Sequence, residues 1–523
     1  MNSKIRKIRT RLLSTATMLI VGSIQLVLAQ ELRWIRVGQL QSFLVDYGSE
    51  NELTPFNNNS FVWPAQYGDN QYTSRMKGLW LGATNFYDPV EKKIKAVKVI
   101  GSGPRYDAVN QPTMIFPQSI ELIGRSNPPI AVVDNQLASS NQLYDVLDKV
   151  QSDLPCDRMV VIKFNTSMGV SVTKKVLAFT QQNHDNYFIY DFVFTNTGIY
   201  NRNGDVMSPP QTLSNFWVHF SYRYAFAGVT SSGWGSTWGA FSSEWGSSTV
   251  QHDFGPYRPL PTTGNMRGFY SFYAPNKERT SVTYDQDWGC PNQNGGGTNL
   301  NGLLGSAKYA GCVTLFASQT PQNFGTDDLS EPATTSYFGS DETIETASVS
   351  QYDDVFMQAR YQRMTEGHLP RSHEESVGNQ YVADWGTTHT DRYGGEQGQG
   401  FGPYTLAPGD SIRIVFAEGV SGISWEKCRE VGAAWYEYYK GTSTPPLDFP
   451  PGTDGTTYTD YTRAWVQTGK DSLLQTFRNA TANFSSNYAV PQPPPAPTSF
   501  SVTSGWGPNS LGVGQECRQC TPF

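Results

Sequence analysis

The clearest pattern in the chain is the alternation of apolar and polar residues between positions 159 and 222. Alternating or short apolar runs occupy residues 159–164, 170–179 and 187–198, and short polar segments separate them. A fourth run follows at residues 216–222. A period of two places successive side chains on opposite faces of a strand, whereas a helix needs apolar residues three or four positions apart. The pattern therefore predicts an antiparallel meander.

Other segments show the same strand-like pattern between turn residues, namely residues 34–48, 76–86, 93–100 and 404–417. The first predicts an opening strand whose phase slips at Gly38. In the last, a Pro408-Gly409 turn precedes the alternation, and this sequence pattern is typical of the late strands of a β-sandwich.

Two late segments have helical spacing instead. Residues 424–439 and 460–480 place apolar side chains three or four positions apart, at Val431, Ala434, Trp435 and Tyr438 and at Trp465, Leu473, Leu474 and Phe477. The Pro-rich stretch between them, residues 444–452, excludes regular structure. We expect a mainly β fold: an antiparallel β-sandwich body, residues 30–489, as one large or two packed domains, with both helices packed on it.

The composition changes at residue 490. Residues 490–497 contain five prolines and predict a stiff, extended linker. Residues 498–505 then alternate as a strand. A Pro-rich segment followed by an alternating strand resembles the opening of a fibronectin type III domain, over about 20 residues. We expect residues 498–523 to be an incomplete domain of this kind, truncated or frame-shifted after about Leu511, with Cys517 and Cys520 accidental.

The first 29 residues have the three parts of a secretory signal peptide. A basic start precedes an apolar stretch from Met18 to Leu28, and Val27 and Ala29 form a small-residue cleavage site. The apolar stretch is shorter than the roughly 20 residues that a membrane-spanning helix needs. We expect cleavage after Ala29 and an extracellular or cell-surface location, with no integral membrane segment afterwards.

Charge and composition narrow the choice of partner. Removal of the five basic residues of the leader lowers the net charge from −7 to −12, because 34 basic residues then face 46 acidic ones. Binding to nucleic acid needs a concentrated basic surface, so we exclude this partner. Aromatic residues make up 13% of the chain and 49 residues are Gly, which favours strands and turns.

The cysteines give one structural hypothesis. In an exported protein, Cys290 and Cys312 could form a disulfide across a short Gly/Asn-rich loop, and buried free thiols are the alternative.

The body resembles large secreted proteins of Bacteroidetes type, which are mostly uncharacterised. The resemblance rests on residues 191–198 (DFVFTNTG) and 406–411 (LAPGDS). Similar segments precede fibronectin type III repeats in those proteins. It implies export and architecture, and it implies no activity.

A loop rich in Gly and Ser carries three indoles, Trp234, Trp238 and Trp245. Exposed indole rings, here or at Trp288, are suited to stacking on sugar faces or to anchoring a partner. The alternative is a cap in which the rings fold back over the edge of the sandwich.

Acidic residues beside tryptophans are the candidates for glycoside hydrolysis. Glu244 adjoins Trp245, and Asp285 and Asp287 adjoin Trp288. A glycosidase needs two carboxyl groups about 5–9 Å apart, a distance that spacing along the chain does not fix.

Metal binding is the weaker hypothesis. Asn201, Asn203 and Asp205 surround a Gly and could supply oxygen ligands to Ca²⁺, but they lack the full series of a calcium loop and favour a plain turn. The ligand types that zinc prefers gather at His368, His373, Glu374, Glu375, Asp384, His389 and Asp391, but Val377 occupies the position of the second His in the helical zinc motif. We therefore expect a solvated loop there and no cofactor.

These observations leave two functional hypotheses. The leading one is a structural or adhesive protein of the cell surface without catalytic activity. The alternative is a carbohydrate-binding module or a glycoside hydrolase that acts on extracellular polysaccharide.

Overall fold

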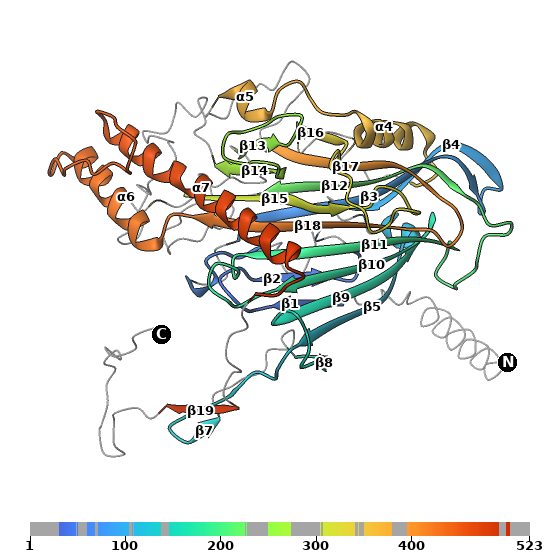
Figure 1. The fold of residues 1–523 in the computed structure, drawn as a ribbon, viewed down its shortest axis with the longest axis horizontal. Helices are drawn as coiled ribbons and strands as arrows, with labels where there is room; N and C mark the ends of the chain where they lie inside the picture. Colours follow the sequence, from blue (N-terminus) through green and yellow to red (C-terminus); the bar gives the residue numbers. More distant parts are fainter. Residues whose placement is uncertain are drawn as a thin grey trace, which may run out of the picture.

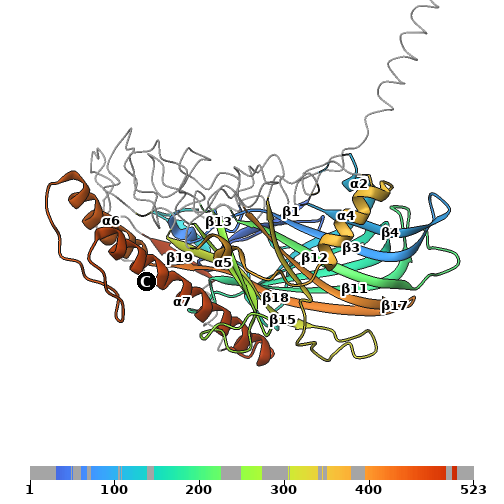
Figure 2. The same ribbon diagram turned by 90° about the horizontal axis from the view of Figure 1, so that it is seen from above.

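The computed structural model covers the chain and describes residues 31–48, 50, 60–67, 72–103, 107, 109–137, 146–224, 226, 249–273, 304, 307–339, 344, 350–378, 395–490 and 498–502. Two large sheets lie face to face, with helices on their outer sides (Figures 1 and 2). The predicted mainly β, sandwich-like architecture is confirmed.

The larger sheet has nine strands in the order β13-β14-β15-β18-β11-β10-β9-β5-β8. Their bounds are Thr249–Phe254, Arg267–Tyr273, Lys308–Ala317, Ser411–Gly422, Tyr187–Ile199, Gly169–Ala178, Arg158–Thr166, Ile115–Gly124 and Lys149–Val150. Only the β5–β8 pair is parallel among these described strands. The predicted meander is present as β9, β10 and β11, which are consecutive neighbours.

The smaller sheet has five strands in the order β16-β17-β12-β3-β4. Their bounds are Thr334–Gly339, Gly395–Leu406, Leu213–Tyr224, Ser74–Asp88 and Lys93–Ser102. The fourth predicted strand of the meander, β12, therefore crosses to the opposite sheet. Alternation gives each strand an apolar face but does not say which sheet it joins.

The core between the sheets is dominated by aromatic rings. Phe220 of β12 lies 5.1 Å, between ring centroids, from both Phe192 of β11 and Phe416 of β18. Both distances fall in the range that favours tilted and edge-to-face pairs. Burying each such side chain contributes about 1.5–3 kcal/mol, so this seam holds the two sheets together.

Both predicted late helices are present. The second is longer than its periodicity indicates, and both have a capping residue at the start. Helix α6 spans Trp425–Lys440, begins after the N-cap Ser424 and ends at Gly441, whose φ is +66°. Helix α7 spans Tyr458–Ser485, and Thr457 and Asp460 form a capping box at its start. Leu473, Leu474 and Phe477 of α7 are buried against the outer face of the nine-stranded sheet.

The described residues also form three helices that were not predicted, α2 (Gln111–Met114), α4 (Asp354–Thr365) and α5 (His373–Val377), together with the 3-10 turn η1 (Ala65–Tyr67). Helix α4 lies over the five-stranded sheet and contacts β4, β17 and β12. Helix α5 replaces the loop expected around residues 368–378, because Ser372 and Glu375 form a capping box that starts it.

The opening segment differs from the prediction. The expected single strand is a hairpin of β1 (Leu32–Ile35) and β2 (Ser42–Val45). Gly38 turns the chain with φ +74°, and a Cβ on it would lie 2.8 Å from the Asp185 carbonyl oxygen. The phase slip in the sequence is therefore a turn.

The strand predicted after the Pro-rich segment is present as β19 (Ser499–Val502). It pairs in parallel with β6 (Ile130–Val133), which also pairs with β7 (Gln136–Leu137). This small sheet lies apart from the sandwich (Figure 1). Within the described ranges, no helix has the length and apolarity needed to cross a membrane.

Candidate functional site

A cleft of about 620 Å³ lies beside α7. The end of β18, the first turn of α6, the β10–β11 turn and the segments around Gln39 and η1 complete its walls. The lining residues are Gln39, Trp63, Pro64, Gln66, Asn183, Asn186, Ser421, Gly422, Ile423, Ser424, Trp425, Glu426, Asp471, Ser472, Gln475, Thr476 and Asn479. We call this feature the α7 cleft.

The polar stripe of α7 gives the cleft one of its walls. Asp471, Ser472, Gln475, Thr476 and Asn479 recur at the spacing of one helical face. The apolar residues between them bind the helix to the sheet. The same amphipathic pattern that attaches α7 therefore turns a row of hydroxyl, amide and carboxylate groups towards the cleft.

Hydrogen bonds hold the Asn186 side chain against two other residues of the lining. Its Nδ2 donates to Ser421 Oγ at 2.9 Å and to Thr476 Oγ1 at 2.8 Å, and these two hydroxyls lie 2.9 Å apart. The amide is thereby held by both of its N–H groups. Within the described structure its Oδ1 is buried and has no hydrogen-bond partner.

Trp63 presents the complementary group. It is only 6% exposed, and its Nε1 is a buried donor without a hydrogen-bond partner in the described structure. Its backbone carbonyl accepts from Lys308 Nζ at 3.2 Å, which anchors the segment to β15. A buried polar atom without a partner costs roughly 1–3 kcal/mol, so a ligand that pairs with it gains this energy back.

A second polar region lies inside the sandwich, and we call it the interior charge cluster. Lys77 Nζ lies 2.5 Å from Glu418 Oε2, and Lys174 Nζ lies 2.6 Å from Glu50 Oε1. Tyr224 Oη donates to Glu418 Oε1 at 2.7 Å. Burial raises the pKa of Glu418 and lowers that of Lys174, and the ion pairs oppose both shifts.

The cluster is closed, because all four charged side chains are at most 8% exposed. Every charge faces a charge of opposite sign at contact distance. This arrangement ties β3 of the five-stranded sheet to β10 and β18 of the nine-stranded sheet, and its charged groups are already paired with one another.

A serine, a histidine and a glutamate meet near α5 in a way that superficially suggests nucleophilic catalysis. Ser372 Oγ lies 2.8 Å from His252 Nδ1, and Glu374 Oε2 lies 3.4 Å from that same nitrogen. In a catalytic triad the nucleophile and the carboxylate contact opposite nitrogens of the ring. Ser372 is moreover occupied as the N-cap of α5, accepting from the Glu375 amide at 3.1 Å. We therefore assign these residues to structure.

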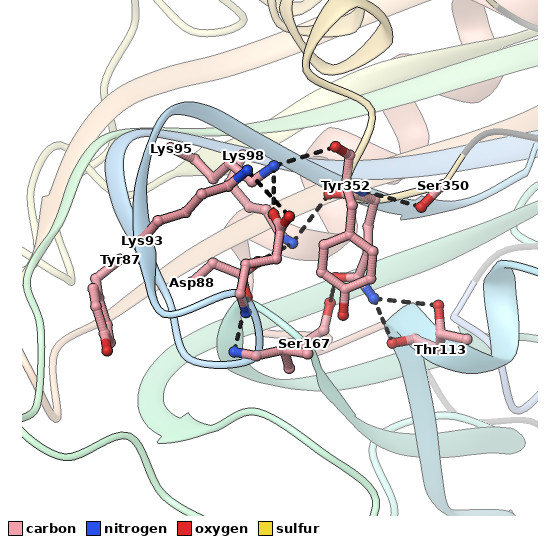
Figure 3. Close-up of polar contacts among 12 residues, drawn as sticks. Tyr87, Asp88, Lys93, Lys95, Lys98, Thr113, Ser167, Ser350 and Tyr352 are labelled. Atoms are coloured by element: carbon pink, nitrogen blue, oxygen red, sulfur yellow. Dashed lines mark hydrogen bonds and ion pairs between the residues drawn. The ribbon is translucent and has the colours of Figure 1, made fainter.

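Figure 3 shows a further polar network, at the end of the sandwich near α4. Lys98 Nζ donates to Asp88 Oδ2 at 2.6 Å and to the Gln351 carbonyl at 3.1 Å. The Gln351 side chain bridges Ser167 Oγ at 2.8 Å and the Thr113 carbonyl at 2.8 Å. These bonds fasten the segment before α4 to the β3–β4 hairpin and to α2.

The calcium candidates lie beside this network. Asn201 and Asn203 line a small cavity of about 280 Å³ together with Asp88 and Tyr352. Asn201 Oδ1 accepts from the Asp205 amide at 3.0 Å, and its Nδ2 donates to Asp205 Oδ2 at 2.8 Å. The side chains thus satisfy one another in a turn, which is the alternative that the sequence favoured. Among the described residues, no three His, Cys, Asp or Glu side chains form a group that could hold a metal ion.

The remaining histidine candidates are separated by the fold. His368 Nδ1 contacts Thr335 Oγ1 at 2.9 Å and its ring stacks on Tyr257, whereas His373 stacks on Tyr337. Asp384, His389 and Asp391 lie outside the described residues.

The other sequence candidates also fall outside the described part of the chain. These are Trp234, Trp238, Trp245, Trp288, Glu244, Asp285, Asp287 and Cys290. Cys312 is described, and it carries a buried free thiol whose Sγ lies 3.6 Å from Tyr222 Oη. The predicted Cys290–Cys312 disulfide is therefore corrected, and the alternative of a buried free thiol holds for Cys312.

The sequence interpretation missed the residues of the α7 cleft. The polar stripe on α7 was a usable signal, because it repeats at helical spacing opposite the apolar face. Trp63 and Asn186 carry no such signal, since they come from short connections that only the fold brings to α7.

Comparisons with known proteins add little. No protein-family model matches the chain, and no curated protein matches it. Among solved structures, a putative aldose 1-epimerase from Escherichia coli K12 is similar with a TM-score of 0.22 and 8% identity. The match covers 76% of this chain and 100% of the other, but a likeness this distant supports no argument about fold or activity.

Proposed function

We propose that this chain is an exported β-sandwich protein that binds a carbohydrate in the α7 cleft and acts in adhesion, without catalysis. The observation that carries the proposal is that two residues lining one cleft each keep a buried polar atom without a hydrogen-bond partner in the described structure, the donor Trp63 Nε1 and the acceptor Asn186 Oδ1. A sugar hydroxyl both donates and accepts a hydrogen bond, and every sugar ring carries several.

The rest of the lining suits the same class of ligand. Amide side chains, which donate and accept in fixed directions, come from Gln39, Gln66, Asn183, Gln475 and Asn479. The partly exposed indole of Trp425 adds flat apolar surface. The volume of about 620 Å³ lies within the range of about 300–1,000 Å³ that is usual for small-ligand sites.

Export is the part of the proposal that rests on sequence. The basic start and apolar stretch of residues 1–29 form the predicted signal peptide, and the acidic net charge disfavours nucleic acid. An extracellular setting would expose the cleft to polysaccharides of cell surfaces and matrices.

The test begins with a glycan array. A neutral oligosaccharide that binds on the array is then titrated into the protein by calorimetry. Replacing Trp63 with Phe removes the indole N–H and keeps an aromatic ring. We expect affinity to fall about tenfold, which corresponds to one hydrogen bond of about 1.4 kcal/mol. Trp465→Phe is the matched control, because this indole donates to the Asp448 carbonyl outside the cleft. A folded Trp63→Phe variant that binds as tightly as the parent contradicts the proposal.

The glycosidase alternative needs its own assay, because Glu426 and Asp471 both line the cleft. We expect the bound oligosaccharide to stay intact when reducing ends are followed over hours. Release of reducing sugar that disappears in Glu426→Gln or Asp471→Asn would assign catalysis to this cleft instead.

A further inference from the structure

The charges around the α7 cleft are unbalanced. Its lining contains the carboxylates of Glu426 and Asp471 and, among the residues that define it, no Lys, Arg or His. From this imbalance, together with the buried and unpartnered indole N–H of Trp63, we infer that the cleft selects neutral or amino sugars and rejects uronic and other anionic sugars. The inference rests on the proposed function and names the class of glycan within it.

One feature of the cleft opposes this selectivity. Ser424, Trp425 and Glu426 form the start of α6, and the N-terminus of a helix of this length carries a partial positive charge. That partial charge amounts to about half a unit, whereas the two ionised carboxylates carry two full negative charges. The Ser424 hydroxyl also already accepts from the Lys427 amide at 3.1 Å. The sum at the cleft is therefore negative.

The nearest cations along the chain are engaged elsewhere. Lys427, next to Glu426, pairs with Glu430 at 2.7 Å and lies 3.9 Å from the centroid of the Trp465 ring. Lys470, next to Asp471, lies 5.8 Å from the centroid of the Tyr270 ring. Their contacts hold both ammonium groups to partners that are not in the lining.

Two further cations contact residues of the lining. Lys308 donates to the Trp63 backbone carbonyl and is fully buried behind it. Arg478 donates to Gln475 Oε1 at 3.2 Å and to the Thr262 carbonyl. The Arg478 guanidinium is thus engaged by two acceptors, and the lining itself offers a ligand carboxylate the carboxylates of Asp471 and Glu426 and no basic side chain.

Electrostatics then distinguishes sugars that match in shape. Glu426 and Asp471 are exposed, so their repulsion of an anionic sugar acts through water and is strongest at low ionic strength. An ammonium group on the sugar gains a charge-assisted hydrogen bond to either carboxylate. The acidic balance of the chain, with a net charge of −7 before any processing, adds a field of the same sign.

The experiment compares oligosaccharides that differ only in charge, by calorimetry at low ionic strength on the whole chain. The probes are galactose and galacturonate oligomers of equal length and linkage, and oligomers of N-acetylglucosamine and glucosamine. We expect galacturonate to bind at least tenfold more weakly than galactose, and glucosamine at least as tightly as N-acetylglucosamine. Raising the salt concentration should narrow the first difference.

Variants assign the selectivity to the named carboxylates. In the double variant Glu426→Gln/Asp471→Asn, the difference between galactose and galacturonate should fall below threefold. Glu437→Gln, an exposed carboxylate towards the other end of α6, should preserve it.

Equal or tighter binding of galacturonate, or an undiminished difference in the double variant, overturns the charge inference and leaves carbohydrate binding intact. Failure of every glycan to bind overturns the proposed function and the charge inference together.

Discussion

The interior charge cluster and the α7 cleft are two polar regions supplied by the same strand. β18 gives Glu418 to the cluster and, three residues later, Ser421 to the cleft. In the cluster every charged group meets an opposite charge within contact distance. In the cleft, Trp63 Nε1 and Asn186 Oδ1 find no partner in the described structure.

The difference separates stability from binding. A buried polar group is costly unless it is paired, so a closed cluster serves the fold, and its removal costs stability. Groups without partners carry that cost in the free protein, and a ligand that reaches these buried atoms and pairs with them recovers it. β18 therefore helps to join the two sheets through Glu418 and supplies Ser421 to the lining of the cleft.

The largest predicted effect tests the closed region. Replacing Glu418 with Gln leaves the Lys77 ammonium buried without its nearest carboxylate. We expect the free energy of unfolding to fall by about 3–5 kcal/mol, measured by urea denaturation. Glu121→Gln is the matched control, because Glu121 pairs with Lys149 at 2.7 Å on the surface and should cost at most about 1 kcal/mol. Similar losses in the two variants would mean that the cluster is accessible to water.

His219 sharpens the comparison, because it too has buried atoms without partners but lies outside the cleft. Both ring nitrogens lack a hydrogen-bond partner in the described structure, and the ring stacks on Trp80. Burial lowers the pKa of His219 to about 3. The unfolded chain, with a pKa near 6.5, binds the proton first, so stability is full above pH 6.5 and falls as the pH drops from 6.5 towards 3.

The predicted slope for His219 is up to about 1.4 kcal/mol per pH unit. His219→Leu should reduce the slope of unfolding free energy between pH 6.5 and 4.5, and glycan affinity should not change. An undiminished slope would show that His219 is already protonated in the folded protein. A loss of glycan binding would break the division between the cleft and the rest of the molecule.

Much of the architecture could be predicted from alternation and spacing. The runs at residues 159–164, 170–179 and 187–198 became β9, β10 and β11, and the two late helices begin within two residues of their predicted starts. These elements are long and strongly periodic, and their caps, Ser424 and Thr457, are local. Local signals therefore sufficed.

Non-local pairing could not be predicted. β12 joins the opposite sheet, and β19 pairs with β6 across more than 360 residues of chain, although both have ordinary strand patterns. The residues of the α7 cleft could not be predicted for the same reason. Asn186 and Thr476 are 290 residues apart, and neither position announces the hydrogen bond between them.

The smallest predicted effect concerns a second closed region, the turn at residues 201–205. Asn201 Oδ1 and Asp205 Oδ2 already take part in the hydrogen bonds of the turn, so Ca²⁺ would have to displace these bonds to use both atoms. Adding calcium or a chelator should leave the melting temperature unchanged. Asn201→Ala should cost up to about 1 kcal/mol, because two exposed hydrogen bonds of the turn are lost. If calcium instead raised the melting temperature and Asn201→Ala removed the rise, this turn would belong with the open regions, and the cleft would no longer be the sole ligand site proposed for the described chain.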